Sequence, residues 1–156
     1  MSVHDIFDTN KHISIAYLRK AYGRQSQEHY HTQPQIVQEI ANAIAPLFRL
    51  NPEDIFIPRR RRDICDARKV LQFALVRGMG MGLTEAGRVS MVGGVDHTTV
   101  VHSCKVVGHI AKTVPAVDTA LTKAVEIARM RKHIESIPCP AITGLHLKPE
   151  PKKKAA

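Results

Sequence analysis

Apolar residues recur every three or four positions through the middle of this chain, the spacing that places them on one face of an α-helix. The first clear repeat runs from Pro34 to about Phe48, and a proline suits the first turn of a helix. Its apolar positions are Ile36, Val37, Ile40, Ala41, Ile44, Ala45 and Leu47. A core helix is therefore predicted over this stretch.

Three further helices are predicted in the same way. A short helix should begin at Asn51 and end before Pro58, because an N-cap residue, a first-turn proline and two acids favour a helix start there. Residues 66–77 form an amphipathic pattern, and a helix from about residue 114 closes the bundle with apolar residues at 116, 120, 121, 124, 125 and 127. The inward positions of the 66–77 helix are predicted to be Val70, Leu71, Ala74 and Leu75.

A glycine pair at 93 and 94, followed by Asp96, precedes a helix whose two faces differ. An Asp at this position can cap the helix by accepting its first free backbone N–H groups. One face carries Thr98, His102, Lys105 and His109, and the other carries Val100, Cys104, Val107 and Ala111. Short hydroxyls and a His in the first turn, with cations further along, suit a helix whose N-terminus enters a DNA major groove.

The string DHTTVVHSCK at 96–105 resembles the start of the recognition helix in the C-terminal DNA-binding domain of the DnaA family of bacterial replication initiators. IAPLFRLNPEDIF at 44–56 resembles the first two helices of that domain, and LTEAGR at 83–88 resembles the first helix of its helix-turn-helix. The resemblance covers about residues 34–130. It implies an all-α helix-turn-helix bundle of about five to six helices, of the DnaA domain IV or Trp-repressor-like kind.

Positive charge is concentrated upstream of that helix. The chain carries a formal net charge of +9, which favours a polyanionic partner. Residues 58–77 hold seven Lys or Arg against two Asp, a local charge of +5, and Arg59, Arg60, Arg61 and Arg62 stand in a row. The resemblance places this row in the basic loop of the family and implies that Arg60 enters the minor groove, where a strongly negative potential favours arginine.

The resemblance also implies roles for individual side chains. Arg60, Arg68, Lys69, His97, Thr98 and Thr99 are predicted to contact a groove or a base, and His102 and Lys105 to meet phosphates. Asp96 would cap the helix and accept a hydrogen bond from a base amino group. The complete predicted DNA-binding set is Arg59, Arg60, Arg61, Arg62, Arg68, Lys69, Asp96, His97, Thr98, Thr99, His102 and Lys105.

Four departures from the family pattern bear on this interface. Lys69 stands where Gln is usual, which replaces a bidentate hydrogen-bonding group by a point charge. Asp66-Ala67 replaces Arg-Pro, and Val95 replaces a common Arg, so two cations are lost. Between Gly87 and Gly93 the chain has two extra residues, so the turn or the end of the preceding helix should differ.

Composition divides the chain into three predicted parts. Residues 1–32 are polar with a short apolar patch and are expected to be an N-terminal arm or a partly ordered helix. Residues 33–134 form the helix-turn-helix DNA-binding domain, and residues 135–156 a Pro- and Lys-rich disordered tail. With 44% hydrophobic but only 4% aromatic residues and no Trp, the core should be aliphatic.

Metal, redox and catalytic chemistry find little support. The three cysteines, 65, 104 and 139, form no CxxC pair, and Cys65 and Cys104 are interpreted as small core residues. His29 and His31 alone make a weak metal site. The sequence contains no GxxxxGK[ST] loop for binding nucleotide phosphates and no nucleophile motif. No enzymatic activity, cofactor or metal is therefore predicted.

Together these features predict sequence-specific binding of double-stranded DNA, at DnaA-box-like sites in a replication origin or its regulation, without ATPase activity. The full-length initiator and other replication proteins are candidate partners. Two alternatives remain open: a helix-turn-helix transcription regulator of a different operator, and a basic protein that binds RNA or membrane surfaces through residues 59–62 and the tail. No apolar run of about 18 residues and no secretion signal appear, which predicts no membrane span and a cytoplasmic, nucleoid-associated protein.

Overall fold

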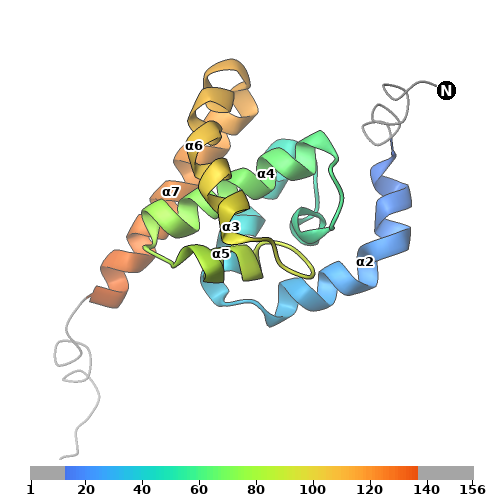
Figure 1. Cartoon of the computed structure of the whole chain (residues 1–156), viewed down its shortest axis with the longest axis horizontal. Coiled ribbons are helices and arrows are strands. Elements are labelled where there is room, and N and C mark those ends of the chain that lie inside the picture. The colour runs from blue at the N-terminus through green and yellow to red at the C-terminus, as the bar shows by residue number, and fades with distance from the viewer. Residues whose placement is uncertain (1–12, 137–156) are drawn as a thin grey trace, which may run out of the picture.

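Residues 13–136, the part of the chain that this computed structural model describes, contain six α-helices and no strand (Figure 1). The α-helices are α2 (Ile15–Thr32), α3 (Gln35–Ile44), α4 (Arg62–Phe73), α5 (Leu83–Val89), α6 (His97–Thr113) and α7 (Pro115–Ser136). Three short helical turns complete the fold: η1 (Ala45–Phe48), η2 (Pro52–Phe56) and η3 (Ala74–Gly78). The predicted all-α fold is confirmed.

The first predicted core helix is divided into α3 and the tighter 3₁₀ turn η1. Pro46 lies at this division, and a proline cannot donate the backbone hydrogen bond that would continue the α-helix. The chain reverses at Arg49, whose φ is 58°, and then enters η2. As predicted, η2 begins after Asn51, whose N–H donates to the Asp54 carboxylate at 2.8 Å. Both turns keep the chain close to α3.

Helix α4 begins at Arg62, four residues before the predicted start at residue 66. The arginine row is therefore not one loop, because Arg62 already belongs to the helix. At the other end α4 widens into the π turn η3, in which the Met79 N–H donates to the Ala74 carbonyl at 3.0 Å. A Cβ on Gly78 would lie 2.7 Å from the Cβ of Ala128, so a glycine lets η3 pack closely against α7.

The core is mainly aliphatic, although Phe56 is fully buried in it, and it is centred on α4, which packs against both α6 and α7 (Figure 1). The four predicted inward residues of α4 and η3, listed above, are all fully buried. Helix α7 follows α6 directly at Val114 and contributes small buried side chains, among them Ala120, Ala124 and Ala128. These small residues allow α7 to pack closely against the helices that it contacts, α4 and α6 among them.

Helix α2 is more firmly attached than a loose arm. Leu18 is 1% exposed, and Arg19 makes a bidentate contact with Asp54 in η2, with the shortest N···O distance 2.7 Å. His29 Nε2 lies 2.8 Å from the Val89 carbonyl oxygen, and its ring stacks at 5.1 Å from Phe56. The predicted boundary at residue 32 coincides with the end of α2, but this helix is part of the packed structure.

Some predictions need correction or fall outside the described residues. Cys65 and Cys104 are only half-buried, so neither is fully enclosed as predicted; Cys104 packs against the core, whereas Cys65 is not part of it. Burial nevertheless raises the pKa of the Cys104 thiol. Cys139 and nearly all of the predicted tail lie outside residues 13–136, and residues 135 and 136 belong to α7. Within the described range, no three His, Cys, Asp or Glu side chains are grouped so that they could hold a metal ion.

Candidate nucleic-acid interface

Helices α5 and α6 form a helix-turn-helix whose connection depends on glycine. The Val95 N–H donates to the Gly87 carbonyl at 3.0 Å, and a Cβ on Gly87 would lie 2.3 Å from the Val95 carbonyl oxygen. Gly93 and Gly94 have φ values of 83° and 75°, a region that glycine adopts without steric strain. The last part of α5 and the residue before the N-cap of α6 are therefore in backbone contact.

Helix α6 has the two faces that its sequence predicts. Val100 and Val107 are fully buried, and Cys104 and Ala111 are half-buried beside them. The opposite face is exposed, with Thr98, His102, Lys105 and His109 at the surface. A hydroxyl and imidazoles near the start of the helix are therefore available to a partner.

Asp96 occupies the N-cap position of α6, as predicted, but its carboxylate does not make the side-chain capping hydrogen bond expected from the sequence. The carboxylate instead accepts the Thr98 hydroxyl at 2.7 Å, and its other oxygen lies 2.8 Å from His97 Nδ1. The hydrogen bond from Thr98 is the main reason that the pKa of Asp96 is lowered. An ionised Asp96 thus orders the side chains of His97 and Thr98 at the tip of the helix.

A groove separates the start of α6 from the arginine loop, which we define as residues 59–61. Its volume is about 640 Å³. Four cations line it and no acid does, so its potential is positive. The groove is lined by Pro58, Arg59, Arg60, Cys65, Arg68, Lys69, Gln72, Met91, Val95, Thr99, His102 and Ser103. Three segments that are distant in sequence therefore bring Arg59, Arg60, Lys69, Thr99 and His102 to one place.

Arg68 lies in this groove but is 8% exposed. Its Nε donates to the Ile55 carbonyl at 3.2 Å, and its Nη2 donates to the Ile57 carbonyl. Burial lowers the pKa of the Arg68 guanidinium, although an arginine remains protonated at neutral pH. The Arg68 side chain therefore mainly stabilises the end of η2 through these hydrogen bonds. Its contact with DNA stays a prediction.

The remaining predicted residues do not line the groove. Arg61 donates to the Ile13 carbonyl at 3.3 Å and pairs with Asp63 at 3.0 Å. Arg62 lies 3.9 Å from Asp66. Both arginines, with these two acids, border a second depression that includes Phe48 and Val114. His97, Thr98 and Lys105 are exposed on α6 outside the groove lining.

Gln72 and Ser103 also line the groove, and the sequence reasoning did not identify them. Gln72 Nε2 donates to Ser90 Oγ at 2.9 Å, whereas its buried Oε1 has no hydrogen-bond partner within the described range. Helical spacing could have identified both residues as neighbours of the predicted site. Gln72 follows Lys69 by three positions and Ser103 follows Thr99 by four, so each lies on the same helix face as a predicted residue. Both residues are nearly fully buried, so they form the floor of the groove.

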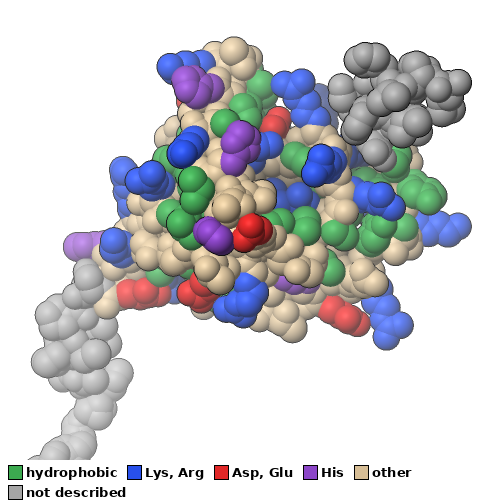
Figure 2. Space-filling model, in the orientation of Figure 1, with side chains coloured by type: hydrophobic (Ala, Val, Ile, Leu, Met, Phe, Trp, Pro, Cys, Tyr) green, Lys and Arg blue, Asp and Glu red, His purple; other side chains and the backbone are tan. Residues whose placement is uncertain are grey.

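The surface around α6 has an uneven charge distribution (Figure 2). Lys and Arg side chains are spread over the part of this face that surrounds α6 and α4, and Asp and Glu side chains are fewer there and lie partly along its lower edge. The described surface next to the groove therefore presents cations to an approaching polyanion.

Residues 37–107 match the family described as the bacterial dnaA protein helix-turn-helix. The match begins within α3 and continues through η1, η2, α4, η3 and α5 to Val107 in α6, and it includes the residues named above as the lining of the groove. This part of the chain is a DnaA helix-turn-helix domain. In this DnaA domain, α5 and α6 are the two helices of the motif, while α2 and α7 lie outside the matched residues.

Curated relatives carry the name chromosomal replication initiator protein DnaA. The protein from Thermomicrobium roseum is 31% identical over 91 residues, which cover 58% of this chain and 18% of that protein. The Synechococcus protein is 29% identical over 91 residues, covering 58% and 19%. The Bifidobacterium animalis subsp. lactis protein is 40% identical over 74 residues, covering 47% and 12%. The matched regions are therefore less than a fifth of each initiator.

No solved structure matches the chain significantly. Within residues 13–136, no helix is both long enough and apolar enough to cross a lipid bilayer. The DnaA helix-turn-helix assignment thus rests on the family match to residues 37–107, on the relatives, and on the arrangement of α5 and α6.

Proposed function

We propose that this chain binds double-stranded DNA at DnaA-box-like sequences, in a replication origin or in its regulation. The observation that carries the proposal is the groove in a DnaA helix-turn-helix domain. Side chains from the arginine loop, α4 and α6 line it, four of them cationic and none acidic. A site of this kind can combine attraction to phosphates with base contacts from the start of a helix.

In the proposed complex, the N-terminal turns of α6 enter the major groove. Thr98, Thr99 and His97 are exposed there and are short enough to reach base edges. Lys105 and His102 lie further along the helix, where they would meet phosphates. These contacts supply sequence preference from one end of α6 and general affinity from the rest.

The arginine loop supplies the second set of contacts. Arg60 is exposed and makes no ion pair or side-chain hydrogen bond within residues 13–136, so its guanidinium is available for the minor groove. Lys69, half-buried at the groove, would add a phosphate contact from α4. Arg68 would act mainly through its hydrogen bonds to the carbonyls of Ile55 and Ile57, which hold the segment leading into the loop.

In this proposal the residues named above recognise DNA and do not hydrolyse ATP. A protein that binds chromosomal DNA in this way would associate with the nucleoid. A chain that reads the same sites as a full-length initiator would either mark an origin or compete with the initiator for its boxes. The curated relatives support this biological setting, because they are named as chromosomal replication initiators.

A direct test compares two duplexes of equal length and base composition, one carrying a DnaA-box-like sequence and the other a scrambled version. We expect at least about tenfold tighter binding to the first at physiological salt, because a few base contacts each contribute roughly 1–3 kcal/mol of discrimination. Equal affinity for both would refute the proposal. Preference for another operator would instead support a transcription regulator. Tighter binding to RNA or anionic vesicles would favour the general basic-surface alternative.

A further inference from the structure

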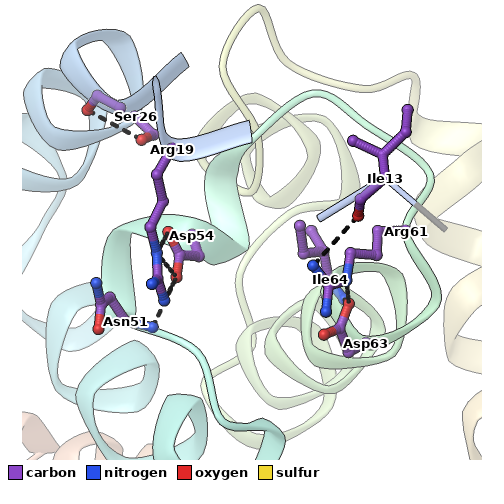
Figure 3. A network of polar contacts seen from close by, with 9 residues as sticks. Ile13, Arg19, Ser26, Asn51, Asp54, Arg61, Asp63 and Ile64 are labelled. Carbon is purple, nitrogen blue, oxygen red and sulfur yellow. Dashed lines mark hydrogen bonds and ion pairs between the residues drawn. The ribbon is translucent and has the colours of Figure 1, made fainter. Parts of the chain in front are cut away.

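The arginine loop is held from outside the DnaA helix-turn-helix domain. The guanidinium carbon of Arg59 lies 5.4 Å from the ring centroid of Tyr22, in the middle of α2. Arg61 donates to the carbonyl of Ile13, just before α2, and also pairs with Asp63 (Figure 3). Two of the three residues of the arginine loop therefore contact the α2 segment.

Helix α2 is itself anchored at several points. Figure 3 shows Arg19 of α2 reaching Asp54, whose carboxylate also accepts the Asn51 N–H. Asp54 is 1% exposed, so this ion pair is shielded from water on one side. Leu18 is buried beside it, and His29 contacts the Val89 carbonyl at the end of α5. The helix thus connects η2, the arginine loop and α5 on one side of the molecule.

The free energy of fixing a long side chain explains why this attachment matters. An arginine loses substantial rotamer entropy when it binds, and a residue already restrained in the free protein loses less. Arg59 lies over an aromatic ring, an arrangement that restrains the guanidinium without removing its charge. Its neighbour Arg60 has no comparable partner within residues 13–136 and depends on the loop backbone for its position.

We propose that α2 is a positioning element of the DNA interface and that Tyr22 is its main positioning residue, holding Arg59 and hence the arginine loop at the edge of the groove. This inference rests on the proposed function. It assigns a role to a helix that lies outside residues 37–107, the segment matched to the DnaA family.

The test uses the full chain with Tyr22→Ala, Tyr22→Phe and, as a control, Tyr17→Ala. Tyr17 lies on the same helix and is 61% exposed, and within residues 13–136 its side chain makes no hydrogen bond or cation–π contact with the loop. Tyr22→Ala should weaken binding to the box-containing duplex by about three- to tenfold, because Arg59 loses its restraint. Tyr22→Phe, which keeps the ring, should stay within about twofold of the parent protein. The control should bind as the parent does.

A double variant separates positioning from a general loss of structure. In an Arg59→Ala background, Tyr22→Ala should have no further effect on affinity, since the contact is already absent. An equal loss in both backgrounds would show that Tyr22 acts through the fold and would overturn the inference. Tighter binding by Tyr22→Ala would also overturn it, because the ring would then be competing with DNA for Arg59.

A measurement on the free protein distinguishes failure of this inference from failure of the proposed function. Side-chain NMR relaxation of Arg59 Nε should show a more mobile guanidinium in Tyr22→Ala than in Tyr22→Phe. Unchanged mobility overturns the positioning role whatever the protein binds. A different outcome is that Tyr22→Ala frees the Arg59 guanidinium but the parent protein shows no preference for the box duplex. That outcome would refute the proposed function and leave α2 as a positioning element for another polyanion.

Discussion

The two sides of the groove differ in both chemistry and support. The α6 side presents hydroxyl and imidazole groups at the start of a helix whose position depends on backbone contacts between Gly87 and Val95. The arginine loop presents long cations that are held by side chains, through Tyr22 and Asp63. Short side chains read bases only if their backbone is accurately placed, whereas long cations can reach phosphates over a range of positions. The first side should therefore determine sequence preference and the second should determine salt dependence.

The largest expected effect comes from removing the cations that line the groove. Changing Arg59 and Arg60 together to Ala should reduce the slope of log affinity against log salt concentration by about 2 units, because each lost phosphate contact contributes roughly 0.9. At 0.1 M salt the same change should weaken binding roughly fiftyfold. The matched variant replaces Arg61 and Arg62, which border the other depression, and should change the slope much less. Equal slopes for both pairs, with helicity preserved by circular dichroism, would contradict this division of the arginine row.

The next effect concerns the close approach of α5 to Val95, the residue before the N-cap of α6. Gly87→Ala should lower the free energy of unfolding by about 2 kcal/mol, because the new Cβ would overlap the Val95 carbonyl. Gly23→Ala is the control, since nothing lies within 4 Å of a Cβ there and alanine favours a helix by about 0.5–1 kcal/mol. Urea unfolding should thus give changes of opposite sign. A neutral Gly87→Ala variant would mean that the turn tolerates a wider separation.

A smaller effect should distinguish base reading from phosphate contact on α6. Changing Thr98 and Thr99 to Ala should reduce the preference for the box duplex over the scrambled duplex by about tenfold, the equivalent of roughly 1.4 kcal/mol. Affinity for the scrambled duplex and the salt slope should change little, because neither threonine carries charge. Similar losses on both duplexes would show that the reading face is assigned wrongly.

The smallest effect concerns Asp66, on α4. Burial raises the pKa of its carboxyl, and the nearby cations Lys69 and Arg62 lower it less. The folded-state pKa of Asp66 therefore lies above its unfolded-state pKa. Protonation of this carboxyl favours the folded protein below the unfolded-state pKa, and that stability is lost as the pH rises through the folded-state pKa. Asp66→Asn should therefore stabilise the protein at neutral pH, by on the order of 0.5 kcal/mol. Thermal unfolding at pH 4 and pH 7 should show the gain only at the higher pH.

Loss of the Arg62 to Asp66 ion pair acts in the opposite direction. Arg62 is largely exposed and the distance is 3.9 Å, so this contribution should be only a few tenths of a kcal/mol. A lower melting temperature for Asp66→Asn at pH 7 would show that the ion pair outweighs the burial of the carboxylate.

Helical periodicity explains why much of the fold could be predicted. The buried positions of α4 and both faces of α6 follow from local spacing, because one face of each helix must meet the core. The apolar pattern predicts the start of α4 four residues too late. Asp63 supports the earlier start by accepting the Ile64 N–H at 2.8 Å. A row of four like charges gave no indication that its last member begins a helix.

The site was less predictable, because the direction of a long side chain depends on partners distant in the sequence. Arg68 and Arg59 both carry a guanidinium near the groove, yet one donates to carbonyls at residues 55 and 57 and the other lies over Tyr22. Neither partner can be deduced from spacing within α4 or the loop. The attachment of α2 cannot be predicted from local spacing either, because Arg19 pairs with Asp54, which is 35 residues away in the sequence.

The backbone bond from the Val92 N–H to the Phe56 carbonyl, at 3.0 Å, crosses between the helix-turn-helix connection and η2. Phe56 is fully buried, so the acceptor of this bond is anchored in the core. Local openings of such a connection normally require little free energy and allow rapid amide hydrogen exchange. Here the Val92 amide should exchange nearly as slowly as the amides of α4, although it lies outside any helix. The turn that presents α6 would then open only together with the core.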